Sequence, residues 1–309
     1  MNKENSDVVY TAIICLGLIA LILWIFLNAV FGNKVPEKQK EISVILYSAG
    51  ADGWESFQEG IKQAENDFSV NINIVTLRED ASAAEQFEIM KREVENGAEA
   101  LAVAVVDHKG LYERIQRNPM PVPMVSVESG FGDDLPLISA DNYEMGKRLG
   151  EEILKDFFGK KDLKIAIADE TILRDSVENR KKGLLDALEG KAKIITLSEV
   201  NAGEKVDAAV AFHKESLLKM VEKKDRSKED IKYYGIGNTT SVVAALDQGK
   251  IENLIFQNEF NMGYFAIQKL SKEINGIQSM ENDCIDFYCV SSEEIYGTQY
   301  EQLLFPIVE

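Results

Sequence analysis

Short apolar runs alternate with amphipathic segments from residue 41 onward. After the apolar run at 42–47, for example, Trp54, Phe57, Ile61 and Ala64 recur at intervals of three and four residues. Such runs are typical of strands buried in a parallel sheet, and such spacing is typical of a helix covering it. The pattern predicts an α/β fold with doubly wound parallel sheets. Strands are expected at residues 42–47, 72–77, 100–106, 123–127, 135–139, 164–168, 194–197, 207–212, 232–237 and 252–257.

So many strands favour two lobes, each with its own parallel sheet, over one large sheet. Helices are expected over residues 142–158, 175–188 and 241–248, among others. In doubly wound sheets, ligands bind beyond the carboxyl ends of the strands. The candidate site is therefore expected in the loops that follow these strands.

The N-terminal region contains an uncharged stretch from Val8 to Asn33, about the length that crosses a bilayer. A cleaved signal peptide would have a shorter apolar run and a small-x-small cleavage site. A lipoprotein would need a small residue before its cysteine, whereas Cys15 follows two isoleucines. We therefore expect an uncleaved transmembrane anchor. The expected parts are a tail at 1–7, the anchor at 8–32, a tether at 33–40 and a body at 41–309.

The charges that flank this stretch leave the orientation open. Lys3 precedes it, whereas Lys34, Lys38 and Lys40 follow it. Because positive residues favour the cytoplasmic side, this asymmetry mildly favours a cytoplasmic body. Charge alone does not place the body outside the membrane.

Composition excludes several classes of function. With 34 Lys+Arg against 52 Asp+Glu, the net charge of -18 disfavours nucleic-acid partners, since DNA affinity depends on neutralising phosphates. The sequence contains 3 Cys and 2 His, too few for a disulfide scaffold or a histidine-rich metal centre, so no metal or cofactor is expected. The glycines at 235–237 lack the G-x-G-x-x-G spacing of a dinucleotide site. Cys284 and Cys289 are expected to be unpaired thiols, with a disulfide as the alternative.

Four segments carry a family pattern. ISADNYEMGKRLGEEIL at 138–154 contains S-x-D-N-x-x-x-G-x-x-x-G, and RKKGLLDAL at 180–188 contains R-x-x-G. The segment at 41–64 reads as an opening strand, loop and helix, and the segment at 233–267 as a strand, helix, hinge strand and helix. Over about residues 41–290, the chain resembles the type I periplasmic sugar-binding proteins (ribose-binding-protein-like), which share their fold with LacI-type repressor cores.

This resemblance implies two lobes that close on a small ligand as a hinged clamp. The N-lobe would comprise about 41–139 and 258–287, and the C-lobe about 140–257 and 288–309. It also implies a non-enzymatic protein of the bacterial cell membrane, single-pass, with its C-terminal domain extracellular. This expectation outweighs the weak charge asymmetry.

The resemblance further implies a substrate-binding protein that serves carbohydrate transport by an ABC importer. The alternative is a ligand-sensing accessory protein of a two-component histidine kinase. A repressor is disfavoured, because an apolar stretch stands where a DNA-binding headpiece would be and the body is acidic. A carboxylate pair for glycoside hydrolysis, drawn from Asp52, Glu128 and Glu178, is also disfavoured, because the family is not catalytic.

Four candidate ligand-binding residues follow strands of the expected N-lobe. By resemblance, Trp54 is a stacking aromatic, with a core position as the alternative. Asp52 would accept a hydroxyl hydrogen bond or else cap the next helix. Glu128 and Ser129 stand where sugar binders have Asp-Arg, so the acid is kept and the base is lost. A solvated loop carboxylate is the alternative for Glu128.

Four more candidates come from the later segments: Glu178, His213, Asn238 and Gln257. The resemblance places Glu178 where an arginine is usual, His213 at an asparagine position, Asn238 beside a lost aspartate and Gln257 at the hinge glutamine. Arg174 or Arg180 could reach into the cleft instead, but Arg180 is expected to pack structurally. The expected ligand is a sugar, polyol or amino sugar. A carboxylate-rich cleft of this kind favours an amino sugar, a polyol or a cationic small molecule over a common aldopentose. A pocket that binds nothing tightly is the alternative.

Overall fold

The computed structural model describes residues 16–26, 39–48, 53–132, 135–169, 171–200, 205–224, 231–278, 281–296 and 300–304. The chain divides into two compact units, Met1–Gln39 and Lys40–Glu309. In the first unit, residues 16–26 are helical. No helix within the described part of the chain is long and apolar enough to cross a membrane. Residues 8–15 and 27–32 of the expected anchor lie outside the described residues.

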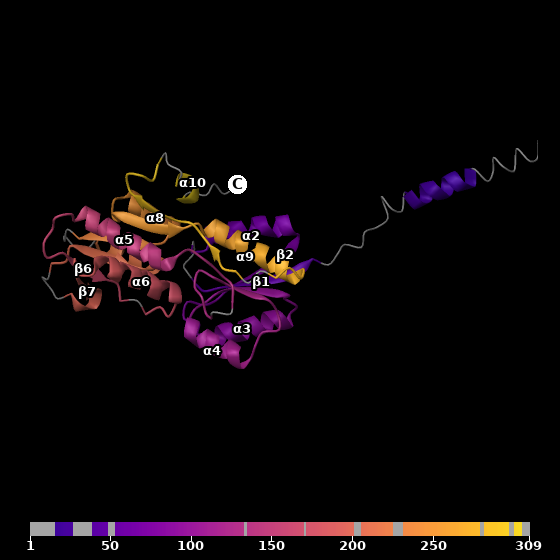
Figure 1. Cartoon of the computed structure of the whole chain (residues 1–309), viewed down its shortest axis with the longest axis horizontal. Helices are drawn as coiled ribbons and strands as arrows, with labels where there is room; N and C mark the ends of the chain where they lie inside the picture. The colour runs from indigo at the N-terminus through magenta and orange to yellow at the C-terminus, as the bar shows by residue number, and fades with distance from the viewer. Residues whose placement is uncertain are drawn as a thin grey trace, which may run out of the picture. The chain divides into compact units, whose positions relative to one another are not determined.

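The first lobe of the second unit contains a parallel sheet of order β11-β5-β4-β3-β1-β2. Helices α2 and α9 cover one face of this sheet, and α3 and α4 cover the other (Figure 1). The strands are β1 Lys40–Leu46, β2 Val70–Thr76, β3 Ala100–Ala104, β4 Met124–Val127, β5 Leu137–Ser139 and β11 Asp283–Cys284. The helices are α2 Glu55–Phe68, α3 Ala83–Glu95, α4 His108–Arg117 and α9 Glu259–Ile274.

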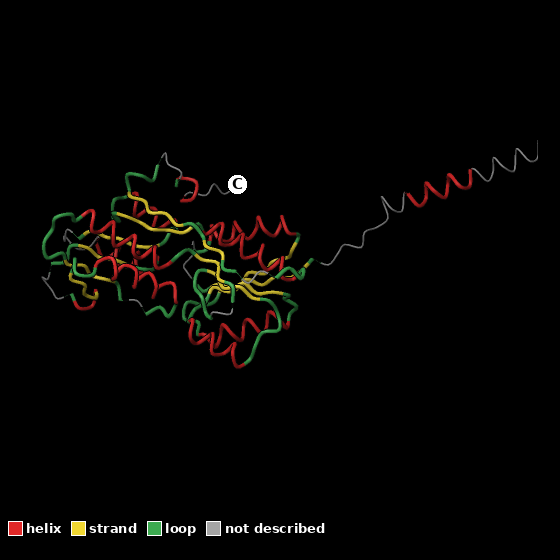
Figure 2. Tube along the Cα trace, viewed as in Figure 1, coloured by secondary structure: helices red, strands yellow, loops and turns green. Residues whose placement is uncertain are grey.

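The second lobe contains a sheet of order β12-β10-β9-β8-β6-β7, in which β12 pairs antiparallel to β10. Helices α5 and α6 pack on one face, and α7, α8 and α10 pack on the other. Figure 2 shows the strands of both lobes in yellow with helices in red around them. Its strands are β6 Lys164–Ile167, β7 Lys193–Thr196, β8 Ala208–Ala211, β9 Lys232–Ile236, β10 Asn253–Gln257 and β12 Phe287–Ser291. Its helices are α5 Asn142–Asp156, α6 Asp175–Leu188, the 3-10 turn Leu197–Glu199, α7 Lys214–Lys224, α8 Thr240–Asp247 and α10 Glu301–Leu304.

Three segments join the lobes, between β5 and α5, β10 and α9, and β11 and β12. Hydrogen bonds link them: Asn258 N donates to Asp286 O at 3.0 Å, and Ile285 N donates to Ser139 O at 2.9 Å. The prediction of an α/β fold with two parallel-sheet lobes is confirmed. Cys284 and Cys289 fall in different sheets, and both are free thiols.

Glycines allow α5 and α6 to pack with their backbones in close contact. A Cβ at Gly183 would overlap the carbonyl oxygen of Tyr143, and a Cβ at Gly146 would overlap the carbonyl oxygen of Arg180. This packing positions α6, and therefore the Arg180 side chain, against the carboxyl end of β4.

We expect Gly183→Ala to lower the free energy of unfolding by about 1–3 kcal/mol, since backbone atoms of α5 cannot yield to the added methyl group. Gly130→Ala is the matched control, because a Cβ there has only ordinary contacts, the nearest at 3.7 Å. Urea unfolding of both variants measures the difference. Equal stability of the two variants would contradict the close helix packing.

Candidate functional site

The carboxyl ends of the two sheets face each other across a small inner cavity of about 20 Å³. This volume holds about one water molecule. We call it the inner cavity; its polar lining includes Glu128, Arg180, His213, Lys214, Gln257 and Glu259. The lobes are therefore closed on each other by their own side chains.

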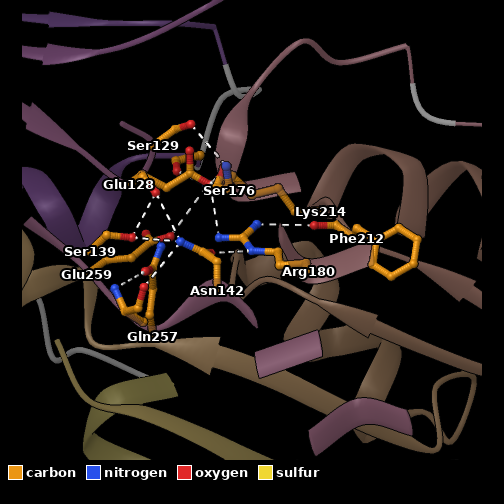
Figure 3. Close-up of polar contacts among 12 residues, drawn as sticks. Glu128, Ser129, Ser139, Asn142, Ser176, Arg180, Phe212, Lys214, Gln257 and Glu259 are labelled. Carbon is orange, nitrogen blue, oxygen red and sulfur yellow. Dashed lines mark hydrogen bonds and ion pairs between the residues drawn. The ribbon is translucent and has the colours of Figure 1, made fainter. Parts of the chain in front are cut away.

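Glu128 stands at the centre of the contacts between the lobes (Figure 3). Its side chain is buried, and its Oε1 accepts hydrogen bonds from Arg180 at 3.0 Å and from the Ser176 hydroxyl at 3.2 Å. Its backbone has a φ of 65°, in the left-handed region that few non-glycine residues adopt. Such strain is found where the surrounding contacts determine the conformation, as they do here.

Arg180 uses every nitrogen of its guanidinium. Besides the ion pair with Glu128, its Nε donates to Asn142 Oδ1 at 2.7 Å and its third nitrogen donates to Phe212 O at 3.1 Å. Burial by itself raises the pKa of Glu128, but Arg180, Arg174 and Lys214 outweigh this effect and hold that pKa below its usual value. Glu128 is therefore a carboxylate in the folded protein.

Ser129 makes the next contact between the lobes. Its hydroxyl accepts a hydrogen bond from the backbone N–H of Ser176 at 3.1 Å, at the first turn of α6. Two sequence-predicted residues, Glu128 and Ser129, thus hold the start of α6 against the end of β4.

Lys214 bridges the lobes on the other side of the inner cavity. Its Nζ donates to the carbonyl oxygen of Gly53, lies 3.7 Å from Glu259 Oε1 and stands 5.2 Å from the centre of the Trp54 ring. The side chains of Lys214 and Glu259 are 6% and 11% exposed. Burial raises the pKa of Glu259, despite the opposing effect of Lys214.

Trp54 lies in the hydrophobic core of the first lobe. Its indole N–H donates to Tyr47 O at 2.8 Å, and its ring makes edge contacts with Tyr47 and Phe57 at centroid distances of 4.9 and 5.1 Å. Only 4% of the residue is exposed. This placement corresponds to the core alternative, and stacking on a ligand stays a prediction.

At the cleft, three buried residues retain polar atoms with no hydrogen-bond partner among the described residues. They are Oε2 of Glu128, both ring nitrogens of His213, and Nε with one terminal nitrogen of Arg174. Arg174 stacks on the Tyr47 ring, with its guanidinium carbon 3.8 Å from the ring centre. Because unpaired buried polar atoms are costly, a group of them at one cleft indicates a place for a polar ligand.

A larger cavity of about 390 Å³ lies on the other side of Tyr47. We call it the outer cavity; its lining includes Tyr47, Ser48, Arg78, Asp107, Leu173 and Arg174. Tyr47 lines both cavities and therefore forms their common wall.

The remaining predicted residues divide between the cavity, the surface and the undescribed part of the chain. Gln257 and Asn238 line the inner cavity, and Gln257 Oε1 accepts from Ala140 N at 3.3 Å. Glu178 lies outside it, with its side chain 51% exposed and 3.7 Å from Lys109. Asp52 lies outside the described residues.

Sequence analysis did not single out three residues of this site, Tyr47, Lys214 and Glu259, and it gave Arg174 only as a residue that could reach into the cleft. Tyr47 directly follows β1, Lys214 directly follows the predicted His213, and Glu259 comes two residues after the predicted Gln257; these positions were the available signal. Arg174 lies in the loop between β6 and α6, and this position was the signal for it, although the sequence does not show its burial. With it, the cleft contains three buried cations and is not dominated by carboxylates.

We expect stability to fall below pH 6.5 because of His213. Burial first, and then Arg174, Lys214 and Arg180, hold its pKa well below 6.5. Between the folded and unfolded pKa values the unfolded chain binds more protons, so the free energy of unfolding falls as pH decreases, by up to about 1.4 kcal/mol per pH unit. Urea unfolding at pH 7.5 and 5.5 should show a larger loss for the wild type than for His213→Asn. Equal losses would contradict a neutral buried imidazole.

Comparison with known proteins agrees with this architecture. Residues 42–215, more than half of the chain, match the family described as periplasmic binding protein domain. No curated protein sequence matches the chain.

Several solved structures share the fold. A carbohydrate transporter solute-binding protein from Agrobacterium radiobacter, in complex with D-arabinose, is 18% identical with a TM-score of 0.78, covering 87% of this chain and 99% of its own. An ABC transporter solute-binding protein from Agrobacterium vitis, bound with α-D-tagatopyranose, is 14% identical with a TM-score of 0.77, covering 86% and 99%. The Caulobacter myo-inositol-binding protein, bound to myo-inositol, is 14% identical with a TM-score of 0.70, covering 84% and 96%. The chain therefore belongs to the periplasmic binding protein domain family.

Proposed function

We propose that this protein is a solute-binding protein for a small polyhydroxylated molecule, a sugar or a sugar-like compound. The observation that carries the proposal is the set of buried polar atoms without partners at the closed cleft, on Glu128, His213 and Arg174. The structures of similar fold with bound D-arabinose, tagatopyranose and myo-inositol support it. The proposed role is binding without a catalytic step.

Hydroxyl groups match the chemistry of the inner cavity. A neutral imidazole offers one donor and one acceptor, a carboxylate oxygen accepts, and the side-chain amides of Asn238 and Gln257 can do both. Each ligand hydroxyl also donates and accepts, so one ring can pair with several of these groups. A ligand that lacks a hydroxyl would leave a buried group unpaired, which gives the site specificity.

Binding requires the lobes to separate, because a cavity of about 20 Å³ does not hold a sugar ring. The contacts that would open are those of Glu128 with Arg180 and of Lys214 with Gly53 and Glu259. In this proposal the ligand replaces part of these contacts, and the lobes close again on it about the three crossing segments.

The proposed setting is the outside of a bacterial cell membrane. Residues 8–32 would anchor the protein as a single span, with the binding body extracellular, where it would deliver its ligand to an ABC importer. The uncharged run at 8–33 and the family support this setting. Capture of a histidine kinase by crosslinking in cells, with no permease, would replace the importer by the sensory alternative.

A ligand panel tests the binding function. Thermal unfolding of the full-length protein is measured with neutral sugars, polyols, amino sugars, sugar acids and nucleosides. A ligand at 100 times its Kd should add about 2.7 kcal/mol of stability. His213→Leu should weaken the response, whereas Gln63→Leu, on the exposed face of α2, should not. No shift with any member of the panel would refute the proposal.

The anchor has a separate test in cells. The full-length protein should sediment with membranes and resist extraction by salt, and deletion of residues 8–32 should release it. Protease added to intact cells should digest the body. A soluble full-length protein, or a body protected from protease until lysis, would contradict the proposed setting.

A further inference from the structure

We infer that the ligand carries one anionic group, which pairs with Arg174. This inference rests on the proposed function and narrows it to sugar acids and sugar phosphates. It differs from the sequence-based expectation, in which a carboxylate-rich cleft favoured an amino sugar or another cationic ligand.

The first argument is the balance of buried charge at the cleft. Arg174, Arg180 and Lys214 are only 3–5% exposed, and all three come from the second lobe. The described residues that face them from the first lobe supply two carboxylates, Glu128 and Glu259. Glu128 pairs with Arg180 and Glu259 lies near Lys214. Neither of these carboxylates therefore serves as the counter-ion of Arg174.

The second argument is the condition of Arg174 itself. The described residues place no carboxylate within ion-pair distance of its guanidinium, and Nε and one terminal nitrogen are buried without a hydrogen-bond partner. Its contact is the face of Tyr47, at 3.8 Å. A cation–π contact compensates a buried charge only partly, and a buried charge without a counter-ion is costly. An anionic ligand group would remove this cost, and guanidinium groups suit carboxylates and phosphates.

The positive charges at the cleft lower the pKa values of two residues near Arg174. The pKa of His213 is lowered by burial and then by Arg174, Lys214 and Arg180. The pKa of Glu128 is lowered even though burial opposes it, because the same three cations act on it. Burial raises the pKa of Glu259, and the nearby Lys214 opposes this effect.

Carboxylates at the outer cavity do not cancel this field. Glu79 is exposed, and Asp107 and Glu215 are half-buried, so water screens their charges. Asp107 also accepts a hydrogen bond from Gly110 N, at the start of α4. The buried guanidinium therefore dominates the inner end of the outer cavity.

The geometry also explains how one ligand can use both cavities. Tyr47 is their common wall, with Arg174 on the outer side and His213 and Gln257 on the inner side. A ring whose hydroxyls pair with His213 and Gln257 can direct an anionic substituent past Tyr47 toward Arg174. Neither cavity alone satisfies all of these groups.

Matched ligand pairs test the inference on the full-length protein by calorimetric titration. D-Glucuronate is compared with D-glucose, and D-galacturonate with D-galactose, so that the members of a pair differ only at C6, where a carboxylate replaces a hydroxymethyl group. D-Glucose 6-phosphate is the phosphate probe. The charged member of at least one pair should bind tenfold or more tightly than its neutral partner. Whether the uronates or the phosphate bind more tightly identifies the anionic group. Added salt should weaken binding of the charged member.

Arg174→Gln should remove the preference for the charged ligand and raise the melting temperature of the ligand-free protein, because a buried charge without a counter-ion is lost. Lys109→Gln is the control: it also removes one positive charge, but its side chain is 73% exposed and lines neither cavity. Lys109→Gln should keep the preference. Arg174→Lys, which keeps the charge, should retain part of it.

The outcomes separate this inference from the proposed function. Equal binding of neutral and acidic sugars, or preference for an amino sugar, would overturn the anionic ligand and leave sugar binding standing. An undiminished preference in Arg174→Gln would also overturn it, because another cation would then hold the anion. No binding by any neutral, acidic or amino sugar would overturn both.

Discussion

The closed arrangement of the two lobes depends on one buried ion pair, between Glu128 at the end of β4 and Arg180 in α6. Breaking such a pair by removing one partner typically costs about 3–5 kcal/mol, because the other charge stays buried. Two neighbouring features allow this ion pair to form. The left-handed backbone of Glu128 directs its carboxylate across the cleft, and the close packing of α5 and α6 at their glycines holds the guanidinium of Arg180 within reach.

Closure of the lobes and binding of a ligand compete for the same polar groups of the cleft. Glu128 and Arg180 are polar groups of the kind that would bind a ligand, but in the closed structure they bind each other. The contacts that a ligand forms must therefore stabilise the complex by more than the contacts it displaces stabilise the closed protein. The unpaired atoms of His213 and Arg174 are the groups through which it can do so, since they gain partners without losing any.

Periodicity made most of the fold predictable, because strands buried on both faces and their covering helices leave regular apolar patterns. The short motif around Asn142 identified the family for a similar reason: Asn142 accepts from Arg180 and its amide contacts Ser139 Oγ at 2.9 Å, so the motif residues are contact residues. The antiparallel direction of β12 was not predictable, because it depends on which lobe the crossing chain enters.

The residues of the site were less predictable than the fold. A residue can follow a strand in sequence without its side chain pointing into the cleft. Gln257 and His213 reach the cavity, whereas Glu178, two residues before Arg180 in sequence, faces solvent near Lys109. Trp54 begins an apolar stripe and also follows a strand, and packing beneath Tyr47 decided its placement. The charge of the cleft depended on Arg174, whose burial only the tertiary structure shows.

The short strands β11 and β12 have a consequence for synthesis of the protein. They come from one segment near the C-terminus, yet β11 completes the sheet of the first lobe and β12 completes that of the second. Neither sheet can acquire its last strand until this segment has left the ribosome. Although domains usually fold in turn from the N-terminus as they emerge, these two lobes must finish together, after the segment at 283–291 has emerged.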